Sequence, residues 1–547
     1  MINMATIIEG EELIKNDGVK KMLKEHIKKN NLIGFPTETV YGLGGNSLSE
    51  ISLKNIFKMK NRPVSDPIIS HVYDIAQAFD QLYHINMYEK YIIYILTSNF
   101  SPGPLSIIAK AKEYLPLILT AHTQFCAVRI PNNKIAREII KICNIPIAAP
   151  SANKFQHISP TNSLHVYEEF KDENILIFDN GQCDIGIEST VIKIIKYKKQ
   201  KEKNISNYSH NENTNCDEYN SDDEIIIDEE YEKECNTEIS DLKCTLNCNN
   251  DISNFEVFEK LKGVFETIKT GNILKESDEN MSIMKNKITE NILKYKNLYN
   301  YEIKIYRRGK YTKNDLKDVL NNTPLLNDIR VSIYKKIEFE KLNILKNKAN
   351  NGCNNEIGHN SIDSKGMDIV RNNNPNNNEN DNSDLSNNIA NNESSMKNEV
   401  SPGTLLTHYS PVVSTYLIDI IKNKDEISNS YSSKLLNIDL NKCVFLDIGN
   451  SFFEYENNFL KYLNISYDNL EVNEQIKYVT KNFFLFLRKA ENLAINNQAE
   501  YIFISIVNLK SLDELTLSIF DRIFRSASGK LFKVFINQHK QLEFFNN

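Results

Sequence analysis

The sequence has no tryptophan, no long apolar run and no excess of positive charge. No apolar stretch reaches the ~18 residues that a membrane span requires, so a transmembrane protein is not expected. The net charge of −7 and the sequence pI of about 5.9 argue against a general nucleic-acid binder, although they leave room for a local basic cleft. The excess of asparagine, lysine, isoleucine and tyrosine beside the missing tryptophan is typical of an AT-rich genome.

Targeting and metal-binding signals are also scarce. The first residues, MINMATIIEGEEL, lack the apolar core of a secretory signal peptide and are too acidic for an obvious organelle transit peptide. The nine cysteines follow no standard zinc spacing, and even Cys244 and Cys248 lie in a tract with the composition of a disordered segment. We therefore expect a reduced, soluble, cytoplasmic protein without a dedicated metal site.

A length of 547 residues and a hydrophobic content of 41% indicate two or more domains with sizeable cores. Residues 5–325 have the alternating helical and strand patterns of a dense α/β domain. Thr312 and Asp315 are spaced as a capping box at the start of a helix that reaches residue 320. In this domain we also expect helices at 11–29, 53–59, 89–99 and 135–143, and strands at 32–35, 67–72, 105–110, 127–130, 145–149, 175–179, 189–195 and 302–306.

Two tracts of biased composition interrupt this pattern. Residues 196–298 are rich in asparagine, glutamate and aspartate, and residues 326–400 are dominated by asparagine. Neither composition buries enough apolar surface to fold by itself, so both are expected to be disordered insertions. The weak helical periodicity at 255–293 does not change that expectation. If the first tract loops out, the strands on either side of it can still pair, because loop closure costs little more for a longer loop.

A Pro- and Gly-bounded linker at 401–412, which includes SPGTLLTHYSP, follows the asparagine-rich tract. Beyond it, residues 413–547 have the pattern of a small α/β domain with a parallel sheet. Here we expect helices at 413–421, 475–491 and 515–526, and strands at 443–446 and 501–506.

The most informative stretch begins with GFPTETVYGL at residues 34–43, which combines an apolar strand, a Pro-bounded turn with the Thr37 hydroxyl, and a glycine-rich segment. FKMKNRPVSDP follows at 57–67. There Lys60 supplies a point charge and Arg62 a planar fork, a combination that suits a polyphosphate. Read alone, the first segment is more often a turn with a helix cap, and the second a solvated charge pair at a helix end.

Two further strands end in groups that need partners. Arg129 ends an apolar strand, where an unpaired charge is costly to bury. It therefore requires a carboxylate, either from an aspartate or glutamate or from an amino-acid substrate. His71 lies near the end of another strand, and a lone histidine is more often a packing residue than a ligand.

The motifs AAPSAN, GIESTV, RRG and HYSP place small or polar residues at other strand ends and in the linker. Small residues let a ligand lie close to the backbone, and an aromatic residue on a linker can close over a nucleotide. Taken singly, each motif is an ordinary turn or strand-to-loop junction. The candidate residues in and near these motifs are Ala149, Ser151, Asn153, Ser159, Ser189, Arg307 and Tyr409.

Taken together and in this order, the motifs resemble the YrdC-like family of L-threonylcarbamoyl-AMP synthases in its long, two-domain form. The resemblance covers about residues 7–195, 301–320 and 401 to the C-terminus, and the two biased tracts lie outside it. DRIFRSASG at 521–529 resembles the end of the second domain in that form. The resemblance implies a YrdC-like twisted mixed sheet with helices, followed by a small Rossmann-like parallel α/β domain.

Members of this family condense L-threonine, bicarbonate and ATP to threonylcarbamoyl-AMP and pyrophosphate, for the threonylcarbamoyl modification of adenosine 37 in tRNA. The resemblance implies Mg²⁺ carried by ATP. It also leaves tRNA or a downstream tRNA-modifying complex as a further, weaker partner. By motif position, the residues expected to hold threonine are Thr37, His71, Arg129, Ala149 and Ser189. Those expected around ATP are Lys60, Arg62, Ser151, Asn153, Ser159, Arg307 and Tyr409, the last acting from the linker as a lid.

The sequence departs from the family pattern in two places. Arg308 stands where proline usually follows the arginine, which makes that turn less rigid. Phe125 and Cys126 occupy a stretch where small hydroxyl or apolar residues are common, so one wall of the pocket is in question.

Other interpretations remain. An RNA-binding module without catalysis would use a basic face made of Lys58, Lys60, Arg62, Lys110 and Lys112. Carbamoyl transfer to a metallocentre-maturation protein is another, but such enzymes carry zinc-type cysteine pairs that the regions expected to be ordered here lack. An inactive paralogue is disfavoured by the near-complete motifs.

Overall fold

The computed structural model describes residues 4–199, 254–270, 279–334, 408–421, 435–466, 469–505 and 514–546. The greater part of both tracts expected to be disordered, and residues 401–407 of the linker, lie outside these ranges. Every element described below belongs to one compact unit.

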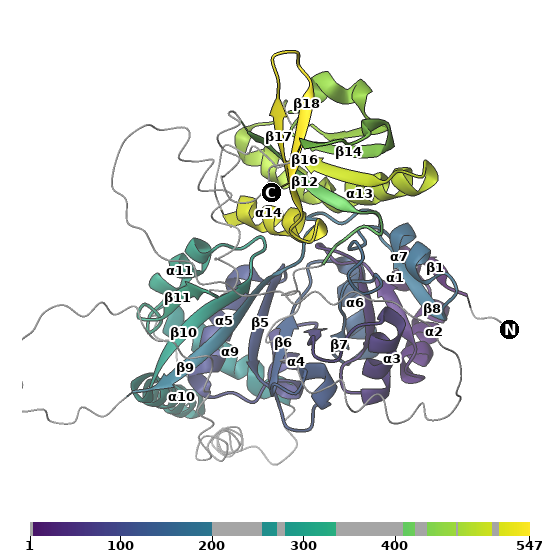
Figure 1. The fold of residues 1–547 in the computed structure, drawn as a ribbon. Coiled ribbons are helices and arrows are strands. Elements are labelled where there is room, and N and C mark those ends of the chain that lie inside the picture. Colours follow the sequence, from purple (N-terminus) through teal and green to yellow (C-terminus); the bar gives the residue numbers. More distant parts are fainter. Residues whose placement is uncertain are drawn as a thin grey trace, which may run out of the picture. The chain divides into compact units, whose positions relative to one another are not determined.

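An 11-stranded mixed sheet organises the first domain (Figure 1). Its strand order is β1-β8-β2-β3-β7-β4-β6-β5-β9-β10-β11. Apolar runs such as LSIIAK and ILIFD form central strands because helices and loops cover both faces of the sheet. The strands are β1 (Thr6–Glu9), β2 (Leu32–Phe35), β3 (Gly42–Asn46), β4 (Ile69–His71), β5 (Leu105–Lys110), β6 (Phe125–Arg129), β7 (Ile147–Ala148), β8 (Ile175–Asp179), β9 (Thr190–Lys198), β10 (Tyr299–Arg307) and β11 (Arg330–Ile333).

The register of the central strands gathers polar positions at one edge of this sheet. β4 pairs with β6 so that His71 lies opposite Arg129. β5 pairs both with the Arg129 end of β6 and with the Thr190 end of β9. β10 runs antiparallel to β9, with Arg307 opposite Val191. The end of β6, the start of β9 and the end of β10 therefore meet.

The helices pack on the sheet through buried apolar clusters. In α6, Ile135 and Ile139 lie one turn apart on the buried face, and the Asn133 side chain caps the first turn. No helix in the described ranges combines the length and the apolar character that crossing a bilayer requires. The α-helices of this domain are α1 (Gly10–Lys15), α2 (Asp17–Lys28), α3 (Glu50–Lys60), α4 (Ile75–Gln81), α5 (Met87–Phe100), α6 (Lys134–Cys143), α7 (Ser163–Phe170), α9 (Asn254–Thr270), α10 (Glu279–Leu298) and α11 (Lys313–Asn321), and a short 3₁₀ helix, η1, spans Leu117–Thr120.

Residues 196–298 were expected to be disordered, and this expectation is wrong over α9 and α10. Figure 1 shows both helices beside α5. Val264 and Phe265 of α9 and Ile288 of α10 are fully buried, and the Phe265 ring packs on Tyr91 of α5 with centroids 5.4 Å apart. The acidic average of the tract hid an apolar face, which is what a helix needs to join a core.

The strands on either side of the first tract form largely as the sequence predicts. β9 and β10 pair antiparallel although more than ninety residues separate them, with Lys198 opposite Tyr299. The capping box of Thr312 and Asp315 is present at the start of α11. The second tract, however, was expected to be disordered from residue 326, and this is wrong for β11, which pairs with β10.

A seven-stranded sheet organises the second domain, in the order β13-β18-β17-β12-β16-β14-β15. Neighbours among β12, β14, β15, β16 and β17 pair parallel, and β13 and β18 add antiparallel pairs at one edge. The α/β class is confirmed, but the helix expected at 413–421 is wrong. TYLIDII forms central strand β12 instead, because its β-branched residues suit a pleated sheet. The elements are β12 (Thr415–Ile421), β13 (Leu435–Leu436), η4 (Leu440–Lys442), β14 (Cys443–Ile448), η5 (Phe453–Asn458), β15 (Lys461–Ile465), α13 (Val472–Asn496), β16 (Tyr501–Ser505), α14 (Glu514–Ser526), β17 (Leu531–Ile536) and β18 (Leu542–Asn546).

The substitution Phe265→Ala tests whether α9 belongs to the core. We expect it to lower the free energy of unfolding by about 3–5 kcal/mol, because it removes a fully buried ring and leaves a cavity. Denaturant titration followed by circular dichroism measures the change. The control is Lys262→Ala on the same helix, whose side chain is about half exposed. A loss below about 1 kcal/mol at Phe265 would contradict this account.

Candidate active site

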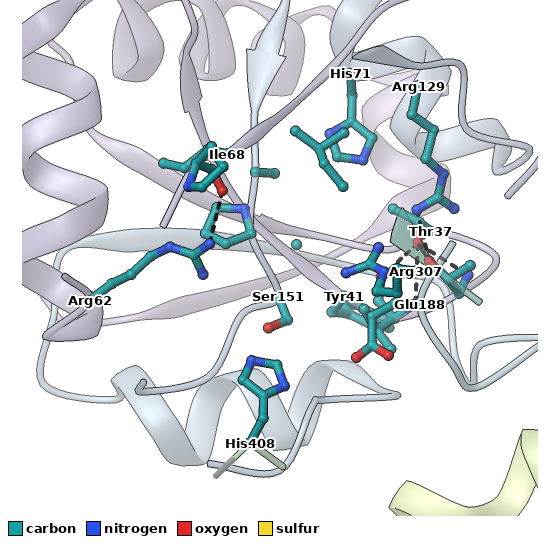
Figure 2. A pocket seen from close by; sticks show the side chains of 17 residues that line it. Thr37, Tyr41, Arg62, Ile68, His71, Arg129, Ser151, Glu188, Arg307 and His408 are labelled. Carbon is teal, nitrogen blue, oxygen red and sulfur yellow. Dashed lines mark hydrogen bonds between the residues drawn. The ribbon is translucent and has the colours of Figure 1, made fainter. Parts of the chain in front are cut away.

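A pocket that is partly open to solvent lies where the polar strand ends meet. Figure 2 shows Arg62 approaching it from one side and His71, Arg129 and Arg307 from the other, with Ser151 between them. Its lining residues are Thr37, Thr39, Val40, Tyr41, Gly42, Arg62, Pro67, Ile68, Ile69, His71, Arg129, Ala149, Pro150, Ser151, Glu188, Arg307 and His408.

The structure brings the twelve predicted site residues together, but in two layers. Those that line the pocket are Thr37, Arg62, His71, Arg129, Ala149, Ser151 and Arg307. The other five lie behind this layer. Each contacts a lining residue directly or through one further side chain, and they are Lys60, Asn153, Ser159, Ser189 and Tyr409. Their assignment to threonine or ATP stays a prediction.

Lys60 is almost completely buried at the end of α3. Its Nζ donates to the Ser151 carbonyl at 2.6 Å and also to the Asn153 carbonyl. Burial and the nearby Arg62 guanidinium lower the pKa of Lys60 well below its usual value. Asn61, at φ 53°, ends the helix in the left-handed conformation that asparagine tolerates, so the chain turns sharply between the two cations. Lys60 thereby holds the backbone of the loop that carries Ser151.

Arg62 is fixed by its own turn. One Nη2 atom lies 2.8 Å from Asp66 and 2.9 Å from the Pro67 carbonyl, and both charged side chains are buried. The aspartate compensates a charge that would be costly to bury alone. The guanidinium is thus rigidly presented to the pocket before any ligand arrives.

Arg129 pairs with a protein carboxylate, one of the two possibilities that the sequence left open. Its Nη2 lies 2.7 Å from Glu38 Oε1, and its Nη1 donates to Thr39 Oγ1 at 2.9 Å. The Glu38 contact is an ion pair without hydrogen-bond alignment, so within the described residues Nη2 has no hydrogen-bond acceptor. Arg129 therefore retains a donor for a second, incoming carboxylate.

His71 faces Arg129 across the pocket wall. Its ring packs edge-on to Phe35 with centroids 5.8 Å apart, and its Nδ1 is 3.4 Å from the Ile147 carbonyl. Burial and the Arg129 charge lower the pKa of His71 to about 3. The imidazole is therefore neutral at physiological pH and can accept or donate one hydrogen bond in the pocket.

Glu188 is a pocket residue whose role the sequence did not predict. Its Oε1 accepts a 2.9 Å hydrogen bond from Ser159 Oγ. The next residue, Ser189, accepts from Arg307 twice, through its carbonyl and its hydroxyl, each at 3.0 Å. The GIEST segment thus positions a carboxylate and a guanidinium together. The glutamate in this motif was the feature of the sequence from which the role of Glu188 could have been predicted.

The linker contributes His408 to the pocket lining, and the predicted Tyr409 lies directly behind it, so its role as a lid stays a prediction. Tyr409, at φ 62°, packs between His408 and Phe484, with ring centroids 3.9 and 5.1 Å away. Burial and the surrounding positive charges, led by Arg62 and Arg525, lower the pKa of His408 well below its usual value, so this ring is neutral. Among the described residues, no group of three or more histidine, cysteine, aspartate or glutamate side chains is placed to hold a metal ion.

Comparisons with known proteins match both parts of the chain. A family described as "Telomere recombination" matches residues 25–203, and one described as "Threonylcarbamoyl-AMP synthase, C-terminal domain" matches residues 374–528. A putative threonylcarbamoyl-AMP synthase of Methanocaldococcus jannaschii is 30% identical over 176 residues, which are 32% of this chain and 80% of that protein. The chain belongs to the threonylcarbamoyl-AMP synthase family. The predicted family resemblance is therefore confirmed.

Longer relatives of this family match this chain over a smaller share of their own length. The threonylcarbamoyl-AMP synthase of Pyrococcus abyssi is 40% identical over 171 residues, 31% of this chain and 49% of that protein. The one from Bacillus subtilis is 36% identical over 183 residues, 33% of this chain and 52% of that protein. The chain thus spans about half the length of these curated relatives.

A solved structure supports the fold of both domains. The crystal structure of P. abyssi Sua5 complexed with L-threonine has a TM-score of 0.52 and 19% identity to this synthase-family chain. The alignment covers 98% of this chain and 100% of that one. This likeness shows that the two-domain architecture is shared.

The substitution His71→Asn tests the neutral state of this histidine. Unfolded histidine has a pKa near 6.5, whereas folded His71 titrates near 3, so between these values only the unfolded chain binds the proton. Stability should therefore fall as the pH drops from 6.5 towards 3. Between pH 7.5 and pH 5 the wild type should lose about 2 kcal/mol more than the variant. Denaturant titrations at both pH values measure this, with His539→Asn on an exposed turn as the control. Equal acid losses in wild type and His71→Asn would exclude the neutral, buried imidazole.

Proposed function

We propose that this chain forms L-threonylcarbamoyl-AMP and pyrophosphate from L-threonine, bicarbonate and ATP, for the threonylcarbamoyl modification of adenosine 37 in tRNA. The observation that carries the proposal is the convergence of three guanidinium groups on one pocket, in a member of this family. The charged lining residues are Arg62, Arg129 and Arg307 against a single carboxylate, Glu188. Such a pocket attracts polyanions and carboxylates.

In this proposal, threonine binds at the Arg129 side of the pocket. The unused Nη2 donor of Arg129 would take the threonine carboxylate. Neutral His71 and the Thr37 hydroxyl would bind the amine or side-chain hydroxyl, and the Ala149 backbone would lie against the ligand. Ser189 would act indirectly, because its oxygens hold Arg307.

ATP binds at the Arg62 side. Arg62, Ser151 and Arg307 would contact the phosphates, while Lys60 fixes the loop that carries Ser151. The residues behind this layer, Asn153 and Ser159, would support the same loop and the Glu188 carboxylate. The nucleotide would be taken up as its Mg²⁺ complex, and the ion would add positive charge beside the phosphates.

The chemistry then requires positioning and charge neutralisation. The threonine amine adds to the carbon of bicarbonate, and water leaves to give a carbamate. A carbamate oxygen attacks the α-phosphorus of ATP in line, and the bond from that phosphorus to the bridging oxygen breaks, so pyrophosphate leaves with the electron pair. Fixed guanidinium groups stabilise the charge on the transferring and leaving phosphates.

The product of such a reaction serves tRNA modification, so the proposed setting is the cytoplasm, with tRNA or a tRNA-modifying complex downstream. The rival interpretation as an RNA-binding module without catalysis predicts salt-dependent RNA binding in the absence of ATP. No contact in the described residues favours that alternative.

The decisive assay mixes the purified chain with MgATP, L-threonine and bicarbonate and measures pyrophosphate. We expect release that depends on all three substrates and on Mg²⁺, with EDTA abolishing it. Pyrophosphate that forms equally well without threonine would contradict the proposal.

Substitution of Lys60 and Arg62 should show whether the activity depends on the cations of the pocket and not on surface charge. Lys60→Ala removes the side chain that holds the Ser151 loop, and Arg62→Ala removes a fixed positive charge of the pocket. Each variant should therefore lower kcat/KM at least about 100-fold. The matched control is Lys58→Ala on the same helix, whose side chain is exposed and should leave the rate unchanged. Thermal unfolding of each variant checks that the fold persists. Full activity in both pocket variants would rule out the phosphate site.

A further inference from the structure

Arg522 of α14, in the second domain, is completely buried and reaches the pocket wall of the first domain. Its Nε lies 3.2 Å from Glu188 Oε2, and its Nη1 donates to the carbonyl and hydroxyl of Ser518 at 3.2 and 3.0 Å. Glu188 itself lines the pocket. A side chain more than three hundred residues away in sequence therefore acts on a charged group of the pocket.

The two oxygens of Glu188 are held from different domains. Ser159 of the first domain binds Oε1 and Arg522 of the second binds Oε2. With both oxygens occupied, the carboxylate is fixed at one place and cannot swing toward Arg307. Within the described part of the chain, Arg307 forms hydrogen bonds only to Ser189 and no ion pair.

This arrangement affects the electrostatic potential of the pocket. Glu188 is the carboxylate that attracts Arg307, while Arg522 and Arg129 are neighbouring cations. If Arg522 were absent, a bare carboxylate would face the incoming triphosphate and would also compete with it for Arg307. Like charges at such close range in a poorly solvated site repel strongly.

We propose that Arg522 is a positioning residue of this pocket: it neutralises Glu188 and keeps Arg307 available for the ATP phosphates, which gives the second domain a direct part in nucleotide binding. The proposal rests on the proposed function, in that ATP is the polyanion concerned. Within the described residues, the Nη2 atom of Arg522 has no hydrogen-bond partner. Burying a guanidinium with one unpaired donor is costly, which fits a group placed for its charge at this point and not for stability alone.

Three variants test the charge compensation. Arg522→Gln should raise the KM and the dissociation constant for ATP about 100-fold, because it leaves Glu188 uncompensated. Glu188→Gln should change both by less than about tenfold, since no negative charge remains to be neutralised. The double variant Glu188→Gln/Arg522→Gln should return to within about tenfold of wild type. A docking contact with no electrostatic role predicts the opposite, a double variant as impaired as Arg522→Gln.

The matched control is a second buried pair between the same two domains. Arg488 of α13 lies 2.8 Å from Glu169 of α7, and neither residue lines the pocket. Arg488→Gln should lower the thermal unfolding midpoint about as much as Arg522→Gln but change the KM for ATP less than about threefold. Equal losses of ATP affinity in the two variants, or wild-type affinity in Arg522→Gln, would overturn the proposal. If Arg522→Gln does not fold, Arg522→Lys, which keeps the charge, should bind ATP within about tenfold of wild type, and a loss as large as 100-fold there would also overturn it.

The outcome for this residue can be separated from the outcome for the reaction. Pyrophosphate release by the wild type tests the reaction, whereas calorimetry with MgATP alone tests the nucleotide site. A wild type that binds ATP without releasing pyrophosphate contradicts the reaction but leaves the comparison of the variants intact. A wild type that binds no ATP contradicts both.

Discussion

Several guanidinium groups share one pocket, and their mutual repulsion is the constraint on which the site depends. The fold meets it by pairing: Asp66 compensates Arg62 and Glu38 compensates Arg129, both from neighbouring segments. Arg307 is instead held by uncharged oxygens of Ser189. Each cation is therefore rigid before a ligand binds, which is the condition for electrostatic stabilisation without reorganisation.

The sequence was a good guide where local chemistry decides the structure. The turn after β2, the cations at and just after the end of α3, and the polar ends of β4, β6 and β10 occur in short motifs, and the sheet register brings them together. The carboxylates that compensate these cations are present in the sequence, but the sequence did not show which cation each of them pairs with. The Arg62–Asp66 pair is local, whereas the Glu188–Arg522 pair depends on how α14 approaches the first domain. No periodicity in the sequence encodes such a contact.

The errors in the predicted fold have two origins, composition averaged over a long window and an apolar pattern that suits a helix and a strand alike. The acidic excess at 196–298 concealed the apolar faces of α9 and α10, which tertiary packing on α5 stabilises. In TYLIDII the mixed apolar pattern fits a helix or a strand equally. Parallel pairing with β16 and β17 stabilises the strand. Tyr409 was named from the HYSP motif as a lid, and the structure also places its neighbour His408 in the pocket lining, which the motif alone did not single out.

The antiparallel pairing of β9 and β10 has a consequence for protein engineering. The chain leaves the sheet at Lys198 and returns at Tyr299, directly opposite. The gap to be bridged is only the spacing of adjacent strands, about 5 Å, whatever the length of the intervening segment. A reporter domain whose own termini lie close together can therefore be spliced into the segment after Lys198 without altering the register that delivers Arg307.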